Sequence, residues 1–454
     1  MNQTEKEGEG FSRRDFLRGG SVATLMTMLG GVELISQAAE PKSDIKFQGP
    51  PVKVAVIGLG GWGRELLNTL MRLEEAEVAA ICDNYPAFLK RAGNAAPKAT
   101  QLADYKTILE NKDIKAVFVA TPTHQHKDIV IAALKAGKHV YCEAPLANTI
   151  EDARAVALAA REAKNQIFQA GLQLRSEPHR HFLLPFIRSG AIGRPLMARA
   201  QWHKKQSWRQ TSPNPEREKA LNWRLDKSLS IGLMGEIGLH HVDQIGWFLN
   251  NTPRAVTGLG ALRRWTEDGR EVPDTVQAVF EYPEDVFCTV DLTLANSFDG
   301  SYEAFYGTDA AVMVRDNKAW MFKEVDSPLL GWEVYAKKET FYKETGIALI
   351  AGASKLQPGA GAPPPDKPED DTLKSAIYNF VTNAGDVDST IADSGDLFKD
   401  DPNGLAEFLK TNVKRRPSAT YLEGFRATVL GIKANEAIVN RKRVEIPREL
   451  HELT

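Results

Sequence analysis

The chain has 454 residues, of which 43% are hydrophobic and 26% are charged. This composition is typical of a globular protein with a sizeable core, and the length fits two or three domains of roughly 150 residues each. The formal net charge of −2 shows no basic excess, so nucleic-acid binding is not indicated. The three cysteines, Cys82, Cys142 and Cys288, are too few and too widely spaced for a disulfide framework.

The first segment in chain order, residues 1–38, is a predicted export signal. Ser12-Arg13-Arg14-Asp15-Phe16-Leu17 is typical of a twin-arginine motif, and the apolar run Gly19–Val32 that follows is shorter than the roughly 20 residues of a membrane-spanning helix. Ser36-Gln37-Ala38 is typical of a cleavage site. We therefore expect the twin-arginine translocase to export the folded protein to the periplasm or beyond. The alternative is an ordinary N-terminal helix with an incidental pair of arginines.

Residues 51–172 alternate between apolar strands and helices, which predicts a parallel sheet covered on both faces. Such an order is typical of a doubly wound, nucleotide-binding Rossmann domain. The expected strands are 52–57, 78–82, 116–120, 139–142 and 167–170, and the expected helices are 62–73, 106–110, 124–136 and 150–163.

A glycine-rich loop, Gly58-Leu59-Gly60-Gly61-Trp62-Gly63, follows the first expected strand and opens a helix. Gly58 permits a tight turn, Gly60 lets the backbone approach a pyrophosphate, and Gly63 allows close packing of the helix on the strand. Asp83 lies twenty residues after Gly63, where a carboxylate accepts hydrogen bonds from ribose hydroxyls and repels a 2′-phosphate. The pattern predicts bound NAD rather than NADP; the alternative is a glycine-rich turn without a cofactor.

Further segments resemble the Gfo/Idh/MocA family of oxidoreductases, and the resemblance runs from about Val52 to Ile446. It is carried by Ala120-Thr121-Pro122-Thr123-His124-Gln125-His126, which resembles the family's A-T-P-x-x-x-H turn, by Gly137-Lys138-His139-Val140-Tyr141-Cys142-Glu143-Ala144-Pro145-Leu146, which resembles its G-K-H-V-x-x-E-K-P-L segment, and by Gly238-Leu239-His240-His241-Val242-Asp243, which resembles its G-x-H-x-x-D helix. The resemblance implies that Thr121, Pro122 and His126 line the nicotinamide side of the cofactor and that Glu143 contacts the nicotinamide ribose.

The resemblance also implies a second domain, of the α+β class, built on a large, open, mostly antiparallel sheet. We expect it over residues 173–420, closed by a helix and strand at 421–454. The sequence is compatible, with β-rich segments at 195–203, 272–282, 286–295, 302–306, 311–314 and 319–322, and helical periodicity at 235–250 and 423–440. Residues 355–372 and 383–403 are expected to be a loop and a surface insertion. In the family the open sheet often forms a subunit interface, which implies a homo-oligomer.

His240 is the candidate catalytic base, because an imidazole titrates near neutral pH and can both take and return a proton. The resemblance places this histidine opposite the nicotinamide. Glu236 lies one turn before it and Asp243 one turn after it, on the same helical face. Either acid is a candidate to orient the imidazole or to bind a sugar hydroxyl. The alternative is that His240 or its neighbour His241 makes a surface or core contact.

Ala144 departs from the family pattern, which has a lysine that binds the reacting hydroxyl and helps its proton to move. Three consequences stay open. Another cation, such as Lys204, Lys205 or Arg224, takes the place of this lysine; His240 acts alone at a reduced rate; or the net reaction is not a simple dehydrogenation. Some exported members of the superfamily hydrolyse glycosides by transient oxidation at C3, elimination and renewed reduction, so that NAD is not consumed.

The substrate class is indicated by tryptophans that stand among hydrogen-bond donors. Trp202 and Trp208 lie close to Lys204, and Trp223 precedes Arg224. Indole rings stack on sugar rings while cationic side chains bind hydroxyls, so the grouping predicts a carbohydrate pocket. The alternative is that these tryptophans belong to the core or to an interface.

No metal site is predicted, because the histidines lack the cysteine or acid spacing of a known site. His179-Arg180-His181 is expected to form a solvated helix face. Three functions therefore stay open: an exported NAD-dependent oxidoreductase acting on a CH–OH group of a sugar, glycoside or polyol; an NAD-recycling glycosidase or lyase; and a non-catalytic sugar-binding protein.

Overall fold

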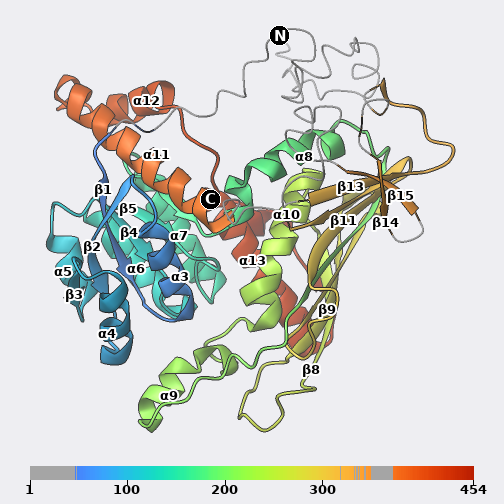
Figure 1. Cartoon of the computed structure of the whole chain (residues 1–454), viewed down its shortest axis with the longest axis horizontal. Helices are drawn as coiled ribbons and strands as arrows, with labels where there is room; N and C mark the ends of the chain where they lie inside the picture. Colours follow the sequence, from blue (N-terminus) through green and yellow to red (C-terminus); the bar gives the residue numbers. More distant parts are fainter. Residues whose placement is uncertain are drawn as a thin grey trace, which may run out of the picture.

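The computed structural model describes residues 47, 49–316, 318–331, 333, 336, 338–341, 344–348 and 372–453. The predicted export signal at 1–38 and nearly all of the predicted loop at 355–372 lie outside these residues. Two sheets stand at opposite ends of the described part, with helices between and around them (Figure 1). Among the described helices, none is long and apolar enough to cross a membrane.

The first sheet has six parallel strands in the order β3-β2-β1-β4-β5-β6. This order reverses direction between β1 and β4, so the loops that follow these two strands diverge and leave a crevice at the carboxyl edge of the sheet. The predicted doubly wound fold is confirmed. The strands are β1 (Val52–Ile57), β2 (Ala76–Cys82), β3 (Thr100–Leu102), β4 (Ala116–Val119), β5 (His139–Cys142) and β6 (Phe168–Ala170).

Helices connect these strands, and α7 (Ile150–Glu162) begins at a side-chain cap. Thr149 caps α7 by accepting a hydrogen bond from the N–H of Asp152. Local sequence patterns did not predict α4 (Pro86–Ala95) or β3, because only Ala92 and Gly93 of α4 are buried and β3 is a three-residue edge strand without a buried residue. The helices are α3 (Gly61–Leu70), α4 (Pro86–Ala95), α5 (Tyr105–Glu110), α6 (His126–Lys135) and α7 (Ile150–Glu162).

The second sheet has ten strands in the order β14-β15-β13-β12-β11-β7-β10-β9-β8-β16, and only the pairing of β10 with β7 is parallel. The predicted mostly antiparallel sheet is confirmed. Its strands are β7 (Pro195–His203), β8 (Ala255–Ala261), β9 (Thr275–Glu281), β10 (Phe287–Thr293), β11 (Ser301–Gly307), β12 (Ala310–Arg315), β13 (Lys318–Lys323), β14 (Lys338–Phe341), β15 (Glu344–Ala348) and β16 (Val444–Glu445).

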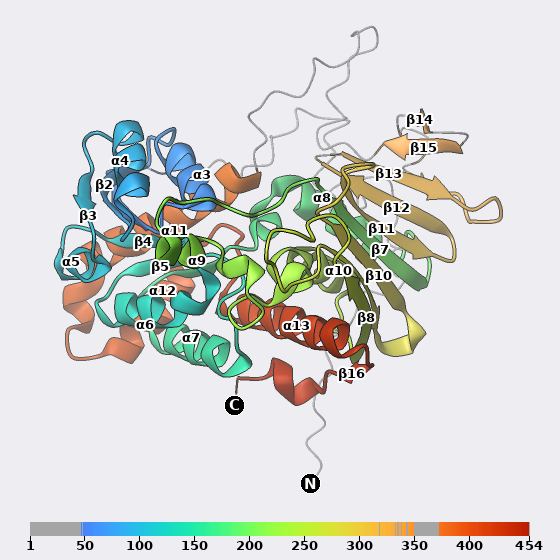
Figure 2. The same ribbon diagram turned by 90° about the horizontal axis from the view of Figure 1, so that it is seen from below.

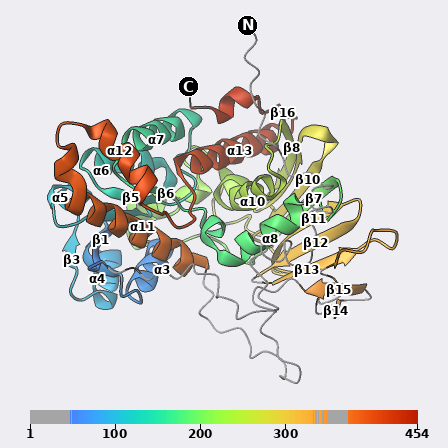
Figure 3. The same cartoon turned by 90° about the horizontal axis from the view of Figure 1, so that it is seen from above.

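Helices α8 (Pro178–Arg188), α10 (Leu239–Leu249) and α13 (Tyr421–Asn440) cover one face of this sheet. Along β9 buried and exposed residues alternate, which leaves the opposite face open. Strand β8, which the sequence analysis missed, contains Gly258, where a Cβ would lie 2.5 Å from Ile438 of α13. The glycines of β8 weaken the sequence pattern of a strand, but they also allow α13 to pack closely against it. Figure 3 shows α13 between the two sheets.

Helices α11 (Thr372–Ser394) and α12 (Pro402–Asn412) return to the Rossmann sheet. Phe380 packs against Phe118 of β4 and Tyr141 of β5. The expected surface insertion at 383–403 was therefore wrong over its first half, and α11 packs with the Rossmann core although the sequence analysis grouped it with the second domain. Its polar composition misled, because Asn383 is buried and donates to the carbonyl of Arg416.

The expected solvated face at His179-Arg180-His181 was also wrong. Glu177 caps α8, and Arg180 is only 6% exposed. The Arg180 guanidinium pairs with the buried carboxylate of Glu303 on β11 at 3.2 Å. A buried ion pair cannot be read from a sequence in which both partners look like surface charges, because 123 residues separate them.

Candidate active site

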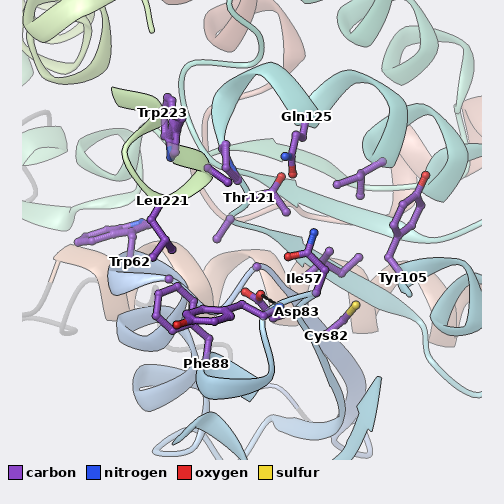
Figure 4. Close-up of a pocket in the computed structure, with 18 of the residues that line it drawn as sticks. Ile57, Trp62, Cys82, Asp83, Phe88, Tyr105, Thr121, Gln125, Leu221 and Trp223 are labelled. Carbon is purple, nitrogen blue, oxygen red and sulfur yellow. Dashed lines mark hydrogen bonds between the residues drawn. The ribbon is translucent and has the colours of Figure 1, made fainter. Parts of the chain in front are cut away.

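A cleft of about 570 Å³ opens at the crevice between β1 and β4. The loops after β1, β2 and β4 form one wall, and a segment of the second domain, residues 210–224, forms the other. In Figure 4, Leu221 and Trp223 lie on the opposite side of the cleft from Asp83 and Phe88. The cleft therefore lies where a doubly wound sheet binds its ligand.

The glycine-rich loop forms the floor of this cleft. Gly58 has a φ of +93°, and a Cβ there would lie 2.7 Å from the backbone of Ala120. At Gly63 a Cβ would lie 1.8 Å from the carbonyl oxygen of Gly58. At Gly60 and Gly61, by contrast, a Cβ would meet nothing within 4 Å, and Gly60 caps α3 without a side-chain hydrogen bond. The N–H groups of the first turn of α3 are thus open to a pyrophosphate.

Asp83 lines the cleft at the end of β2. Its Oδ2 accepts a hydrogen bond from the N–H of Leu59 at 2.8 Å, and its Oδ1 accepts one from the N–H of Tyr85 at 2.7 Å. These bonds fix the carboxylate beside the glycine loop. Since each carboxylate oxygen can accept more than one hydrogen bond, the group keeps capacity for ribose hydroxyls.

Thr121 and Pro122 line the cleft after β4, whereas His126 lies behind them. The Nε2 of His126 is 2.9 Å from the carbonyl oxygen of Thr121, and its Nδ1 is 2.9 Å from that of Pro145. Burial lowers the pKa of His126 to about 4, so the ring is neutral at pH 7 and donates to one of the two carbonyls. His126 therefore lies between two loops of the site, with a hydrogen bond to one of them, and does not line the cleft as the sequence predicted.

Glu143 follows β5 and is 8% exposed. Burial raises its pKa to about 7, against the opposing effect of Trp62 and other nearby donors. Trp62, at the start of α3, is 40% exposed and lines the cleft. A carboxyl group with this pKa is divided between its charged and neutral forms at neutral pH.

Five buried polar atoms around this region have no hydrogen-bond partner among the described residues. They are Thr121 Oγ1, His124 Nδ1, Glu143 Oε1, Arg224 Nε and Glu236 Oε1. Buried polar atoms in folded proteins are normally hydrogen-bonded. Three of these atoms belong to residues that line the cleft, namely Thr121, His124 and Arg224.

Arg224 joins the cleft to the helical segment that carries His240. It lines the cleft, and its Nε lies 3.7 Å from Oε2 of the buried Glu236. The guanidinium lies 4.9 Å from the ring centroid of Trp223 and 5.5 Å from that of Trp208. Trp208 has a φ of +65°, a strained value for a bulky residue. The structure thus brings three of the four predicted substrate residues together.

Lys204, the fourth predicted substrate residue, is placed elsewhere. Its side chain is exposed just beyond the end of β7, and its N–H bonds to the carbonyl of Thr293. Lys205 is exposed beside it. Of the cations that the sequence analysis weighed as substitutes for the missing lysine, only Arg224 lines the cleft.

The two acids beside His240 have other partners. Glu236 lies in a π-helical turn, Met234–Gly238, and accepts a hydrogen bond from Thr123 Oγ1 at 3.3 Å. Asp243 is buried and makes two hydrogen bonds of 2.8 Å with Arg175. Neither carboxylate contacts the His240 imidazole, so the expectation that one of them orients it is not met in this structure.

His240 is partly exposed at the start of α10, and its ring has no hydrogen-bond partner among the described residues. Burial, with the nearby charge of His241, lowers its pKa to about 4. The imidazole is thus neutral at pH 7, as a base must be. His240 does not line the 570 Å³ cleft. His241 makes a core contact, with Nδ1 2.6 Å from Oε1 of Glu303.

Sequence reasoning missed several residues of the cleft, among them Tyr85, Phe88, His124 and Arg217. Tyr85 and Phe88 follow β2 within five residues of Asp83, and the rule that ligands bind at carboxyl ends of strands gave a signal for them. Arg217 comes from the second domain, and no local pattern marks it. Among the described residues, no group of three or more His, Cys, Asp or Glu could hold a metal ion.

Comparison with known proteins supports the fold. Residues 52–171 match the model of an oxidoreductase family with an NAD-binding Rossmann fold, GFO/IDH/MocA, and residues 185–313 match the model of the GFO/IDH/MocA C-terminal domain. The fold and the cleft define an NAD-binding Rossmann protein with a second, open-sheet domain. Because the two models together match more than half of the sequence, the chain belongs to the Gfo/Idh/MocA family.

Two relatives and one solved structure show how far the likeness extends. A levoglucosan dehydrogenase of Pseudarthrobacter phenanthrenivorans is 37% identical over 142 residues, 31% of this chain and 34% of that protein. An inositol 2-dehydrogenase of Salmonella typhimurium is 28% identical over 207 residues, 45% of this chain and 56% of that protein. The matches thus span about a third to about half of these relatives. The structure of a levoglucosan dehydrogenase with NADH and levoglucosan has a TM-score of 0.65 at 19% identity, covering 88% of this chain and 100% of that chain, and shows the same fold.

Proposed function

We propose that this protein is an NAD-dependent oxidoreductase that acts on a CH–OH group of a sugar, glycoside or polyol. The observation that carries the proposal is the cleft that joins the open first turn of α3 and the Asp83 carboxylate to Arg224 of the second domain. The relatives named as levoglucosan and inositol dehydrogenases support the substrate class. The stacked Trp208, Arg224 and Trp223 support it too, because aromatic faces and cationic donors suit a sugar ring.

The residues divide the chemistry between them. Bound NAD would supply the hydride acceptor. His240, neutral at pH 7, takes the hydroxyl proton. Arg224 stabilises the negative charge that develops on the hydroxyl oxygen, a role that Ala144 cannot fill. Glu236 holds the Arg224 guanidinium from its buried side.

An NAD-recycling glycosidase or lyase is the second candidate, and Ala144 favours it. A transient oxidation at C3 acidifies the proton on C2, the aglycone leaves by elimination, water adds, and the ketone is reduced again. The cofactor is regenerated in each cycle. Such a cycle suits a protein outside the cytoplasm, where NAD is scarce.

One experiment separates these two candidates from a non-catalytic sugar-binding protein. The mature protein is incubated with a panel of glycosides and polyols in deuterated buffer, and the products are followed by NMR. A ketone that retains its aglycone supports the oxidoreductase. A released aglycone with deuterium at C2 supports the recycling cycle. Saturable binding without any product, and without change in a His240→Ala variant, would reject both catalytic proposals.

We also propose that the protein is exported through the twin-arginine pathway and forms a homo-oligomer. Arg13 and Arg14 support the first proposal, and the open face of the second sheet supports the second. Cell fractionation of wild type and an Arg13→Lys/Arg14→Lys variant tests export, which the variant should abolish. Light scattering tests the oligomer, and a monomer at micromolar concentration would reject it.

A further inference from the structure

Residues 207–224, which we call the strap, leave the second domain and cross to the Rossmann domain. The strap includes the short helix α9 (Pro215–Leu221), which Figures 1 and 2 show next to the Rossmann elements and away from the second sheet. Gln210, Arg217 and Leu221 of the strap line the cleft together with the glycine loop. The strap therefore supplies a wall to a cleft whose floor belongs to the other domain.

The strap is braced at its origin in the second domain. Ser207 Oγ donates to the Asp268 carboxylate at 3.1 Å, and Arg209 donates to the Asp268 carbonyl at 2.8 Å. Arg270, whose side chain is fully buried, holds the same carboxylate and the Ser207 carbonyl. These bonds fix the position from which the strap extends.

The strap is also closed on itself. The side chain of Asn222 accepts from the N–H of Gln210 at 2.8 Å and donates to its carbonyl at 2.8 Å. Asn214 caps α9 by accepting from the N–H of Arg217 at 2.9 Å. Because its ends are joined, the strap can act as a unit rather than as a loose loop.

Arg217 joins the strap to the Rossmann domain at the adenosine end of the cleft. Its Nη1 donates to the side-chain oxygen of Asn84 at 2.9 Å, and its Nη2 donates to the Asn84 carbonyl at 3.0 Å. The guanidinium lies 4.7 Å from the ring centroid of Tyr85. Asn84 and Tyr85 directly follow Asp83, the expected ribose ligand, so this contact bridges the cleft beside the ligand.

We infer that the strap is a clasp that retains the dinucleotide and that Arg217 is its latch. The inference rests on the proposed function as far as NAD is the ligand, and it adds a retention device contributed by the second domain. A dinucleotide seated between the glycine loop and the strap leaves only after the bidentate contact of Arg217 with Asn84 has broken. Retention of this kind suits a protein that carries its cofactor away from the supply.

The test measures NADH release without any sugar substrate. Purified protein is stripped of cofactor, loaded with NADH and mixed rapidly with excess NAD, and the decay of NADH fluorescence gives the release rate. The variants are Arg217→Ala, Asn84→Ala and the double variant. Lys219→Ala is the matched control, since this cation lies on the same helix with an exposed side chain. Arg217→Lys keeps the charge and loses the bidentate geometry.

We expect Arg217→Ala to speed release by about tenfold or more, since two charge-assisted hydrogen bonds are lost. Asn84→Ala should have a smaller effect of the same sign, and the double variant should release NADH no faster than Arg217→Ala. Arg217→Lys should lie between wild type and Arg217→Ala, and Lys219→Ala should match wild type.

Unchanged release in a folded Arg217→Ala or Arg217→Lys protein would overturn the latch. Additive effects of the two substitutions would also overturn it, because they would mean that Arg217 contacts the cofactor independently of Asn84. A protein that retains NADH through Arg217 but oxidises no sugar would reject the proposed function and leave the clasp standing. Rapid NADH release from a wild-type protein with normal turnover would reject the clasp and leave the proposed function standing.

Discussion

At the scale of single residues, Ala144 stands where the resemblance to the family predicts a lysine. Among the described residues that line the cleft, Arg224 is the cation paired with the buried Glu236, and its guanidinium lies over the rings of two tryptophans. An arginine keeps its charge at any accessible pH, so it stabilises a developing negative charge but does not exchange protons. Under the proposed mechanism, proton transfer then falls to His240 alone.

Removing Arg224 should therefore harm turnover, and a lysine at the family position should repair part of the loss. We expect Arg224→Ala to lower kcat/KM by about 100-fold or more, as for other residues that stabilise a transition-state charge. Adding Ala144→Lys should recover at least about tenfold of that loss if the two cations serve the same oxygen. Initial rates over a range of substrate concentrations give kcat and KM. Lys227→Ala, which removes a nearby cation with a 71% exposed side chain, is the control. If Ala144→Lys does not raise kcat/KM of the Arg224→Ala variant, the two cations do not serve the same oxygen.

Under the proposed mechanism, the low pKa of His240 predicts the acid limb of the pH profile. The base is active when neutral, so activity is kept above its pKa and lost as the pH falls through it. With a pKa of about 4, kcat/KM should stay nearly constant down to about pH 5 and fall below it. Steady-state rates between pH 4 and 8 provide the measurement, with His240→Asn as the inactive control. A limb centred at 6.5 or higher would mean that His240 is solvated in the working enzyme or is not the base.

At the scale of elements, two glycines at the start of α3 have different roles: Gly63 allows the helix to pack, and Gly60 leaves room for a ligand. A Cβ at Gly63 would lie 1.8 Å from the Gly58 carbonyl, so this glycine is needed for the helix to pack on β1. A Cβ at Gly60 would meet no protein atom within 4 Å. The space that it would enter is the space that a pyrophosphate needs.

Two substitutions at these glycines should therefore have opposite signatures. We expect Gly60→Ala to leave the melting temperature within about 2 °C of wild type and to weaken NADH binding by about tenfold or more. Gly63→Ala should lower the melting temperature clearly, because backbone atoms must move to relieve the overlap. Thermal melts and NADH fluorescence titrations measure both properties. Equal affinity in Gly60→Ala and wild type would place the pyrophosphate elsewhere.

At the scale of the whole molecule, buried ionisable groups make stability depend on pH in opposing directions. His126 has a pKa of about 4 in the folded protein, lowered by burial from 6.5. Its contribution is present above pH 6.5 and is lost as the pH falls towards 4, because the unfolded chain binds the proton first. Glu143, whose pKa is raised to about 7, acts in the opposite sense between pH 7 and 4.5, since the folded state binds its proton first.

Comparison of wild type with a His126→Gln variant isolates the contribution of His126 to the pH dependence of stability. From pH 7 to pH 5 the His126 contribution should fall by about 2 kcal/mol, at about 1.4 kcal/mol per pH unit below 6.5. A His126→Gln variant, which keeps a donor and an acceptor but does not titrate, should lose correspondingly less stability over this interval than wild type. Urea unfolding at both pH values gives the difference. Parallel pH dependence in the two proteins would contradict a neutral, buried His126.

Local patterns predicted most of the Rossmann domain and several strands of the second sheet, because apolar runs and glycine turns are properties of short segments. The glycine loop and Asp83 belong to this class. The partners of Asp243 and Glu236 could not be predicted in this way, since Arg175 lies 68 residues from Asp243 and Thr123 lies 113 residues from Glu236. Arg217 shows the same limit, because the residue that it contacts, Asn84, lies 133 residues earlier in the chain.

The return of α11 to the Rossmann sheet bears on the order of events during synthesis. Ile377, Phe380 and Val387 belong to the same core as β1 and β4, although more than two hundred residues of the second domain intervene. A ribosome that has released only the first 172 residues has therefore made a sheet with one layer of its core missing. The residues that line the cleft end at Arg224, but the core layer behind β1 and β4 is complete only when α11 has emerged. Firm retention of a dinucleotide is therefore expected only after synthesis has passed α11.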